Sequence, residues 1–110
     1  MILVNEKKII TLRQLVDKKM QTEEKIVELY VEDFGWLTLL LDALEFVQDS
    51  WYNSTRYNRS VIEFDEENIS INLKHVYKKN QAYDSHQNNQ LYNLIFEEIN
   101  IFADKIIAYR

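Results

Sequence analysis

Residues 61–77 read VIEFDEENISINLKHVY, and this stretch decides how the rest of the chain is interpreted. Apolar side chains recur at every second position on both sides of Asp65-Glu66-Glu67-Asn68, as they do in strands with one buried face. The four polar residues between the two runs have the composition of a hairpin loop. The sequence therefore predicts a β-hairpin over 61–77 at the centre of a small antiparallel sheet.

Helical patterns lie on both sides of this hairpin. Thr11 and Gln14 have the spacing of a capping box, and the apolar residues after them predict a helix over 12–20. Residues 36–49 and 91–109 carry apolar side chains around most of a helical circumference, which predicts two buried helices. The expected fold class is therefore α+β, with three to four helices packed on the small sheet.

Residues 22–34 allow two interpretations. A threonine followed by acids has the character of a helix start, and the apolar residues continue at helical spacing. Val27, Leu29 and Val31 also alternate with polar residues, as they would in a half-exposed strand. We expect a helix with a kink or break near Asp33–Gly35, and the strand is the alternative.

Composition excludes several classes of protein. The chain has 110 residues, which fits a single domain over 1–110, and it contains no cysteine and one glycine. Disulfides, thiolate nucleophiles and glycine-rich phosphate loops are therefore excluded, and we expect no cofactor, no metal and no catalytic activity. No apolar run approaches the roughly 20 residues of a membrane span, and no secretory signal is visible, which predicts a cytoplasmic protein.

Negative charge is concentrated in one part of the chain. Residues 22–49 carry eight acids against Lys25 alone, whereas residues 1–21 are net positive and the whole chain has a net charge of −5. An exposed acidic stretch of this kind attracts a basic partner and accelerates association. The alternatives are a solvated face, or a face neutralised by lysines of the amino-terminal segment.

This pattern favours a small acidic inhibitor that neutralises a more basic protein by blocking its site. Immunity proteins against toxins or nucleases, and phage-encoded inhibitors, have this general character. We expect acids of 22–49 and of the hairpin loop to contact the partner, with aromatic residues as desolvated anchors. The expected partner-binding residues are Glu24, Glu28, Glu32, Asp33, Asp42, Glu45, Asp49, Trp51, Tyr52, Tyr57, Asp65, Glu66 and Glu67.

The sequence also bears on two other classes of partner. Aromatic and arginine residues interleave over 51–59, as in proteins that stack on nucleic-acid bases, but the acidic composition disfavours a nucleic acid. The wide apolar faces expected for 36–49 and 91–109 would also suit a second copy of the chain. The alternative function is therefore a homo-oligomeric structural or regulatory protein, with a homodimer as its simplest form.

Overall fold

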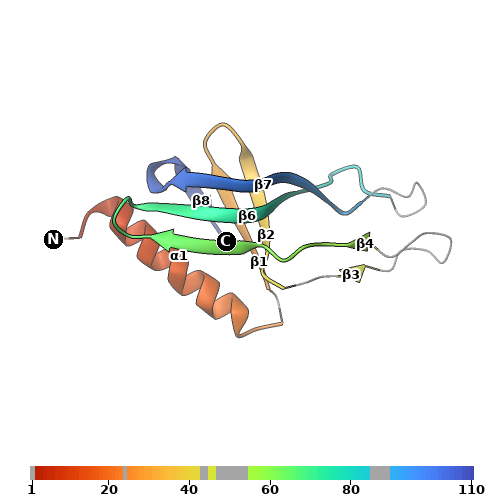
Figure 1. The fold of residues 1–110 in the computed structure, drawn as a ribbon, viewed down its shortest axis with the longest axis horizontal. Coiled ribbons are helices and arrows are strands. Elements are labelled where there is room, and N and C mark those ends of the chain that lie inside the picture. Colours follow the sequence, from red (N-terminus) through yellow and green to blue (C-terminus); the bar gives the residue numbers. More distant parts are fainter. Residues whose placement is uncertain (1, 24, 43–44, 47–54, 85–89) are drawn as a thin grey trace.

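The computed structural model describes residues 2–23, 25–42, 45–46, 55–84 and 90–110, and over these ranges the chain is mostly β-strand (Figure 1). A single α-helix comes first and lies beside a curled antiparallel sheet of six strands. The elements are α1 (Val4–Met20), β1 (Ile26–Val31), β2 (Gly35–Leu40), β3 (Glu45–Phe46), β4 (Thr55–Arg56), β5 (Val61–Asp65), β6 (Ser70–Lys79), β7 (Tyr92–Phe102), the 3-10 turn η2 (Ala103–Lys105) and β8 (Ile106–Tyr109).

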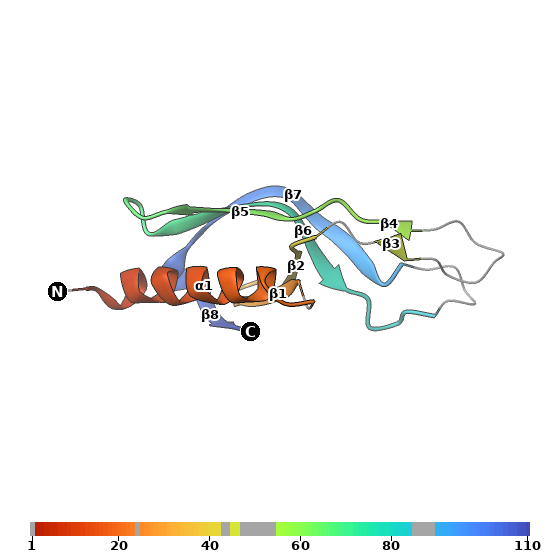
Figure 2. The same ribbon diagram turned by 90° about the horizontal axis from the view of Figure 1, so that it is seen from below.

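β6 organises the sheet because it has three neighbours. β7 pairs with β6 along one edge from Ser70 to Lys79. On the other edge β5 pairs with β6 as far as Lys74, and β2 takes over at Tyr77. β1 then pairs with β2, and β8 pairs with β1, so the sheet curls into a half-barrel that arches over α1 (Figure 2). β3 and β4 form a separate two-stranded ribbon.

Strand β6 bends where its neighbour changes. His75 has a φ of +57°, a value that L residues with a side chain rarely adopt, and it lies between the part of β6 that pairs with β5 and the part that pairs with β2. The buried Ser60 hydroxyl donates to the His75 carbonyl oxygen at 2.6 Å and accepts the Leu40 N–H at 2.9 Å. One hydroxyl therefore connects β2 with β6 at the bend.

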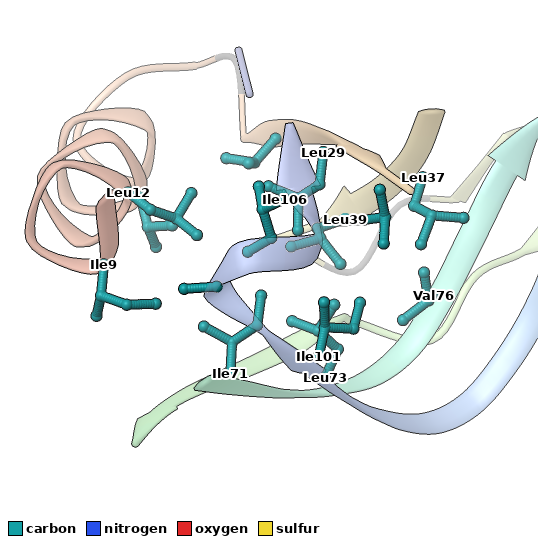
Figure 3. Packing of buried hydrophobic residues seen from close by; sticks show 14 of the residues in the cluster. Ile9, Leu12, Leu29, Leu37, Leu39, Ile71, Leu73, Val76, Ile101 and Ile106 are labelled. Carbon is teal, nitrogen blue, oxygen red and sulfur yellow. The ribbon is translucent and has the colours of Figure 1, made fainter. Parts of the chain in front are cut away.

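The hydrophobic core fills the space between α1 and the concave face of the sheet. Ile9, Leu12 and Val16 form one stripe of the helix, and in Figure 3 the first two point toward buried side chains of the sheet. Burial of each large aliphatic side chain contributes about 1.5–3 kcal/mol. The sheet supplies Val27, Leu29, Val31, Leu37, Leu39, Leu41, Ile71, Leu73, Val76, Ile101 and Ile106 to this cluster.

Two side chains of α1, those of Lys8 and Thr11, form hydrogen bonds with η2 and β8. Lys8 Nζ donates to the carbonyl oxygens of Ala103 and Ile106 at 3.0 and 2.6 Å. The Thr11 hydroxyl and the Tyr109 hydroxyl form a hydrogen bond with each other. The amino-terminal helix is thereby fixed to η2 and β8, which are nearly 100 residues away in sequence.

The expected fold class of three to four helices on a small α+β sheet is wrong, because the structure holds one helix within the described ranges and most other elements are strands. The hairpin expected at 61–77 is present as β5 and β6. The helix expected at 12–20 is the second half of α1, which begins at Val4.

Three predicted helices are strands, each for a physical reason. At 22–34 the alternative was right: β1 alternates buried and outward side chains, and Asp33 and Gly35, with φ of +74° and +75°, make a hairpin turn to β2. In 36–49, the part from Trp36 to Leu40 is a strand covered on both faces, and such a strand lacks the period-two pattern. Over 91–109, the β6–β7 pairing is irregular at His75 and shifts register after Val76, so the inward positions of β7 have a mixed spacing.

A membrane-crossing helix is not found in the part of the chain that the structure describes.

Candidate functional site

Three expected partner-binding acids of the segment 22–49 form ion pairs within the molecule. None of their partners is one of the amino-terminal lysines that were the expected source of neutralising charge. Asp33 is exposed in the β1–β2 turn. The pairs, with their N···O distances, are Glu28–Arg110 at 3.1 Å, Glu32–Lys105 at 3.5 Å and Asp42–Lys25 at 3.4 Å.

Several other expected partner-binding residues lie outside the described part of the chain. Glu24, Asp49, Trp51 and Tyr52 fall in the gaps between described ranges, and for Glu45 only the strand position in β3 is described. The expected acidic surface of 22–49 is therefore represented by Glu23, Glu28, Glu32, Asp33 and Asp42, and three of these five carboxylates already have a cation.

Tyr57, expected as an exposed anchor, is only 4% exposed. Its ring makes edge-to-face contacts with Tyr77 and Tyr92, with centroids 5.7 and 5.6 Å apart. Together with Leu40, these rings form a second hydrophobic cluster. Burial raises the pKa of both Tyr77 and Tyr92, so their hydroxyls stay protonated at neutral pH. Tyr57 therefore contributes to packing.

A coherent group of acids lies instead on the outer surface of β5, β6 and β7. Ile62 and Phe64 point toward the core, so their neighbours Glu63 and Asp65 lie on the opposite face of β5. Register places Glu63 beside Asn72 of β6, and Asn72 beside Asn100 of β7. We call this surface the acidic face. It consists of Glu63, Asp65, Glu66, Glu67 and Glu98, with Asn72 and Asn100 between them.

The acidic face is hollowed and only partly neutralised. A shallow depression of about 620 Å³ runs over Glu63, the turn after β5 and the two asparagines. Arg13 of α1 pairs with Glu66, with Nη2 and Oε1 2.8 Å apart, and Asn72 Nδ2 donates to Glu98 Oε1 at 3.0 Å. Glu63 and Glu67 are exposed and form no ion pair with any described residue.

Hydrogen bonds hold the β5–β6 turn in shape. Asn68 Nδ2 donates to Asp65 Oδ2 at 2.8 Å, and the Asn68 backbone N–H donates to Asp65 Oδ1 at 3.0 Å. These bonds favour the charged carboxylate and hold the pKa of Asp65 below its usual range. Asp65 therefore keeps its negative charge to lower pH than an ordinary aspartate.

Removing the Asn68 side chain is expected to raise the pKa of Asp65 toward its ordinary value, because the largest stabilising contact of the carboxylate is lost. A pKa that is lower in the folded chain stabilises the fold above the unfolded-state pKa, and this contribution disappears as pH falls through the folded-state pKa. The measurement is an NMR titration of the Asp65 side-chain carboxyl in Asn68→Ala. Asn100→Ala, outside the turn, is the control, and an equal pKa in both variants would contradict the assignment.

An open strand edge borders the acidic face. Within the described residues β7 pairs with β6 alone, so its other edge presents unpaired backbone groups over a strand of 11 residues. Leu94, Ile95 and Phe102 of this strand are between 42% and 56% exposed. Edges of this kind accept an additional strand from a partner.

The sequence had named part of the acidic face, namely Asp65, Glu66 and Glu67, and had missed Glu63 and Glu98. Glu63 could have been found, because the alternation that predicted the hairpin also places Glu63 and Asp65 on one face. Glu98 could not be found, since the sequence predicts a helix over 91–109.

Over the described ranges, no group of three or more side chains that could hold a metal ion is present. Comparisons of the chain with protein families, with curated proteins and with solved structures find no match.

Proposed function

We propose that this protein is a small non-catalytic inhibitor that binds a more basic protein, such as a toxin or nuclease, and blocks its site. The contact surface in this proposal is the acidic face, in place of the acids of 22–49. The observation that carries it is the clustering of five carboxylates on the outer surface of β5–β7 and in the β5–β6 turn, four of them without an ion pair to a described residue. The cysteine-free chain suits a reducing compartment, and the same proposal places the binding in the cytoplasm.

The acidic face can attract and orient a cationic surface. Its charges project from a paired sheet and a hydrogen-bonded turn, so they need little reordering when a partner arrives. Arginine or lysine side chains of the partner could contact Glu63 and Glu67 directly and compete with Arg13 for Glu66. The open edge of β7 beside them offers backbone hydrogen bonds to an extended segment.

Charge reversal on the acidic face is expected to abolish most of the binding. The partner is captured from host cells with the tagged full chain, purified, and titrated by calorimetry against the wild type and against Glu63→Lys/Glu67→Lys. Because both carboxylates would face cations, we expect Kd to rise by at least about tenfold in the variant and also on raising salt from about 50 to about 300 mM. The captured protein's own activity should fall when it is bound.

A matched variant separates the acidic face from general charge. Glu23→Lys/Asp33→Lys makes the same change in net charge at exposed positions of the segment first expected to bind. Its Kd should stay within about twofold of the wild type after allowance for long-range steering. Equal losses in both double variants, or affinity that does not respond to salt, would reject the acidic face as the contact surface.

The open edge of β7 favours a second candidate function, a homodimer that pairs β7 with β7 of another copy. The wide apolar faces of two α-helices, on which this alternative rested, are absent because the described parts of 36–49 and 91–109 contain strands and no α-helix. Glu97 and Glu98 near the middle of β7 disfavour a centred pairing, since like charges would lie opposite each other. Sedimentation as a monomer at high concentration would exclude this alternative.

A further inference from the structure

A second surface, on the other half of the sheet, holds a further cavity. The core-facing residues of β1 and β2 are Val27, Leu29, Leu37 and Leu39, so the residues between them line the opposite face. There a cavity of about 750 Å³ opens, a size that suits a small molecule. The lining side chains that matter are Glu28, Trp36, Thr38, Lys78, Lys79 and Arg110.

Contacts with Glu28 and Trp36 orient Arg110 at the mouth of this cavity, where its side chain is 63% exposed. Its backbone exchanges two hydrogen bonds with Glu28, with N···O distances of 2.8 and 3.0 Å, so it extends the pairing of β8 with β1. Its Nε donates to Glu28 Oε1 at 3.1 Å, and its guanidinium carbon lies 4.0 Å from the centre of the Trp36 ring. The two terminal nitrogens have no acceptor among the described residues. A guanidinium presented in this way suits bidentate binding of an oxyanion.

Thr38 contributes an unused polar group to the same cavity. The residue is 2% exposed and its backbone is paired with β1 and β6, yet its hydroxyl has no hydrogen-bond partner among the described residues. Buried hydroxyls are nearly always hydrogen-bonded, because an unsatisfied one loses the hydration it had in the unfolded chain. A ligand in the cavity would supply the missing partner.

The charge of the cavity is opposite to that of the whole chain. Three cations, Lys78, Lys79 and Arg110, face one carboxylate, Glu28, which Arg110 already neutralises. Lys78 Nζ donates to the Phe34 carbonyl oxygen at 2.8 Å, so this ammonium group is fixed at the β1–β2 turn. A positive, partly enclosed site in a protein of net charge −5 selects for an anion.

We propose that this cavity binds a small organic molecule through a carboxylate or phosphate group, with Arg110 and the Thr38 hydroxyl as its main contacts. The terminal nitrogens of Arg110 take the oxyanion, and Lys78 and Lys79 add positive charge. Ile26 and Tyr92, which also line the cavity, contact the apolar part of the ligand. The site shares no residue with the acidic face, so the proposed ligand binding does not depend on the proposed inhibitor function.

Four probes of similar size test this site by NMR on the full chain. Benzoate and phenyl phosphate carry the two anionic groups, benzyl alcohol is neutral and benzylamine is cationic. At least one anion is expected to shift the Trp36 indole and Thr38 amide signals saturably at about millimolar concentration, while the neutral and cationic probes do not. Trp36→Phe assigns the indole signal. The anion that binds identifies the group as carboxylate or phosphate, and the absence of saturable shifts with both anions would overturn the proposal.

Variants distinguish the site from non-specific attraction. Arg110→Gln should weaken the binding anion by about tenfold, because the bidentate contact is lost, whereas Arg59→Gln, an exposed arginine outside the cavity, should leave it unchanged. Thr38→Val should weaken binding while raising Tm, since it removes the unsatisfied hydroxyl at nearly constant volume. Lower affinity in a more stable protein cannot be caused by unfolding, and unchanged affinity in both cavity variants would reject the proposed contacts.

Discussion

Replacing Leu12 with alanine is expected to lower the free energy of unfolding by about 2–5 kcal/mol, the range for deleting a large aliphatic side chain from a packed core. Leu12 is fully buried and lies in the middle of the helix stripe that faces the concave side of the sheet (Figure 3). α1 is the only helix of the described chain that covers this face. A cavity at this position therefore weakens the contact that joins the helix to the sheet.

Urea unfolding followed by circular dichroism measures the effect of Leu12→Ala. Val4→Ala, at a position of the same helix that is 79% exposed, is the matched control and should change stability by less than about 0.5 kcal/mol. If both variants unfold at the same urea concentration, α1 does not pack on the sheet as described.

The second large effect is expected for Ser60→Ala. The hydroxyl is the only side-chain group that bonds both Leu40 of β2 and His75 of β6 in the described residues. Its removal leaves the buried Leu40 N–H and the partly buried His75 carbonyl without this partner, and an unsatisfied buried group costs about 1–3 kcal/mol. We expect lower thermal stability and faster amide hydrogen exchange at Leu40.

Ser70 provides the control for this variant. It is as buried as Ser60, at 1% against 2% exposed, but its hydroxyl makes no hydrogen bond to a described residue. Ser70→Ala should therefore be neutral or slightly stabilising, because no partner is left unsatisfied. Similar losses of stability in both serine variants would show that the two hydrogen bonds of the Ser60 hydroxyl do not stabilise the fold.

Local signals in the sequence predicted the elements whose pattern is local. The hairpin of β5 and β6 has alternation on one open face and a polar turn, and both are visible without tertiary contacts. Leu12 and Val16 have the helical spacing that predicted the second half of α1. The acids of the β5–β6 turn were likewise assigned to a surface because a hairpin turn lies in solvent.

The remaining strands were hidden by tertiary effects. The run from Trp36 to Leu40 is mostly apolar because one face of β2 lies in the main hydrophobic core and the tyrosine cluster covers part of the other face. In β7, Phe96 and Ile99 both pack on the core although they are three positions apart, while Leu94 and Ile95 are exposed, and this spacing imitates that of a helix. The apolar run of β2 and the mixed spacing of β7 can be assigned to strands only when the paired neighbouring strands are known.

The break expected near Asp33–Gly35 is the hairpin turn after β1, so this local signal was noticed but was assigned to a kinked helix. Asp33 and Gly35 both take positive φ values, and an acidic residue close before the single glycine of the chain is a turn pattern for a hairpin. With Val27, Leu29 and Val31 alternating before it, this turn favours the strand over the helix. Neither Arg110 nor Thr38 could be assigned to a cavity, since they meet only through the pairing of β8, β1 and β2.

The attachment of α1 to β8 and η2 sets a condition on the order of folding. Lys8 bonds carbonyls 95 and 98 positions further along the chain, and β1 gains its outer neighbour only when β8 arrives. During synthesis on the ribosome, the early helix and the first hairpin must therefore wait for residues 103–109 before their apolar surfaces are sealed. Contacts this distant in sequence close slowly, so the nascent polypeptide passes through a stage in which chaperones would find exposed hydrophobic surface.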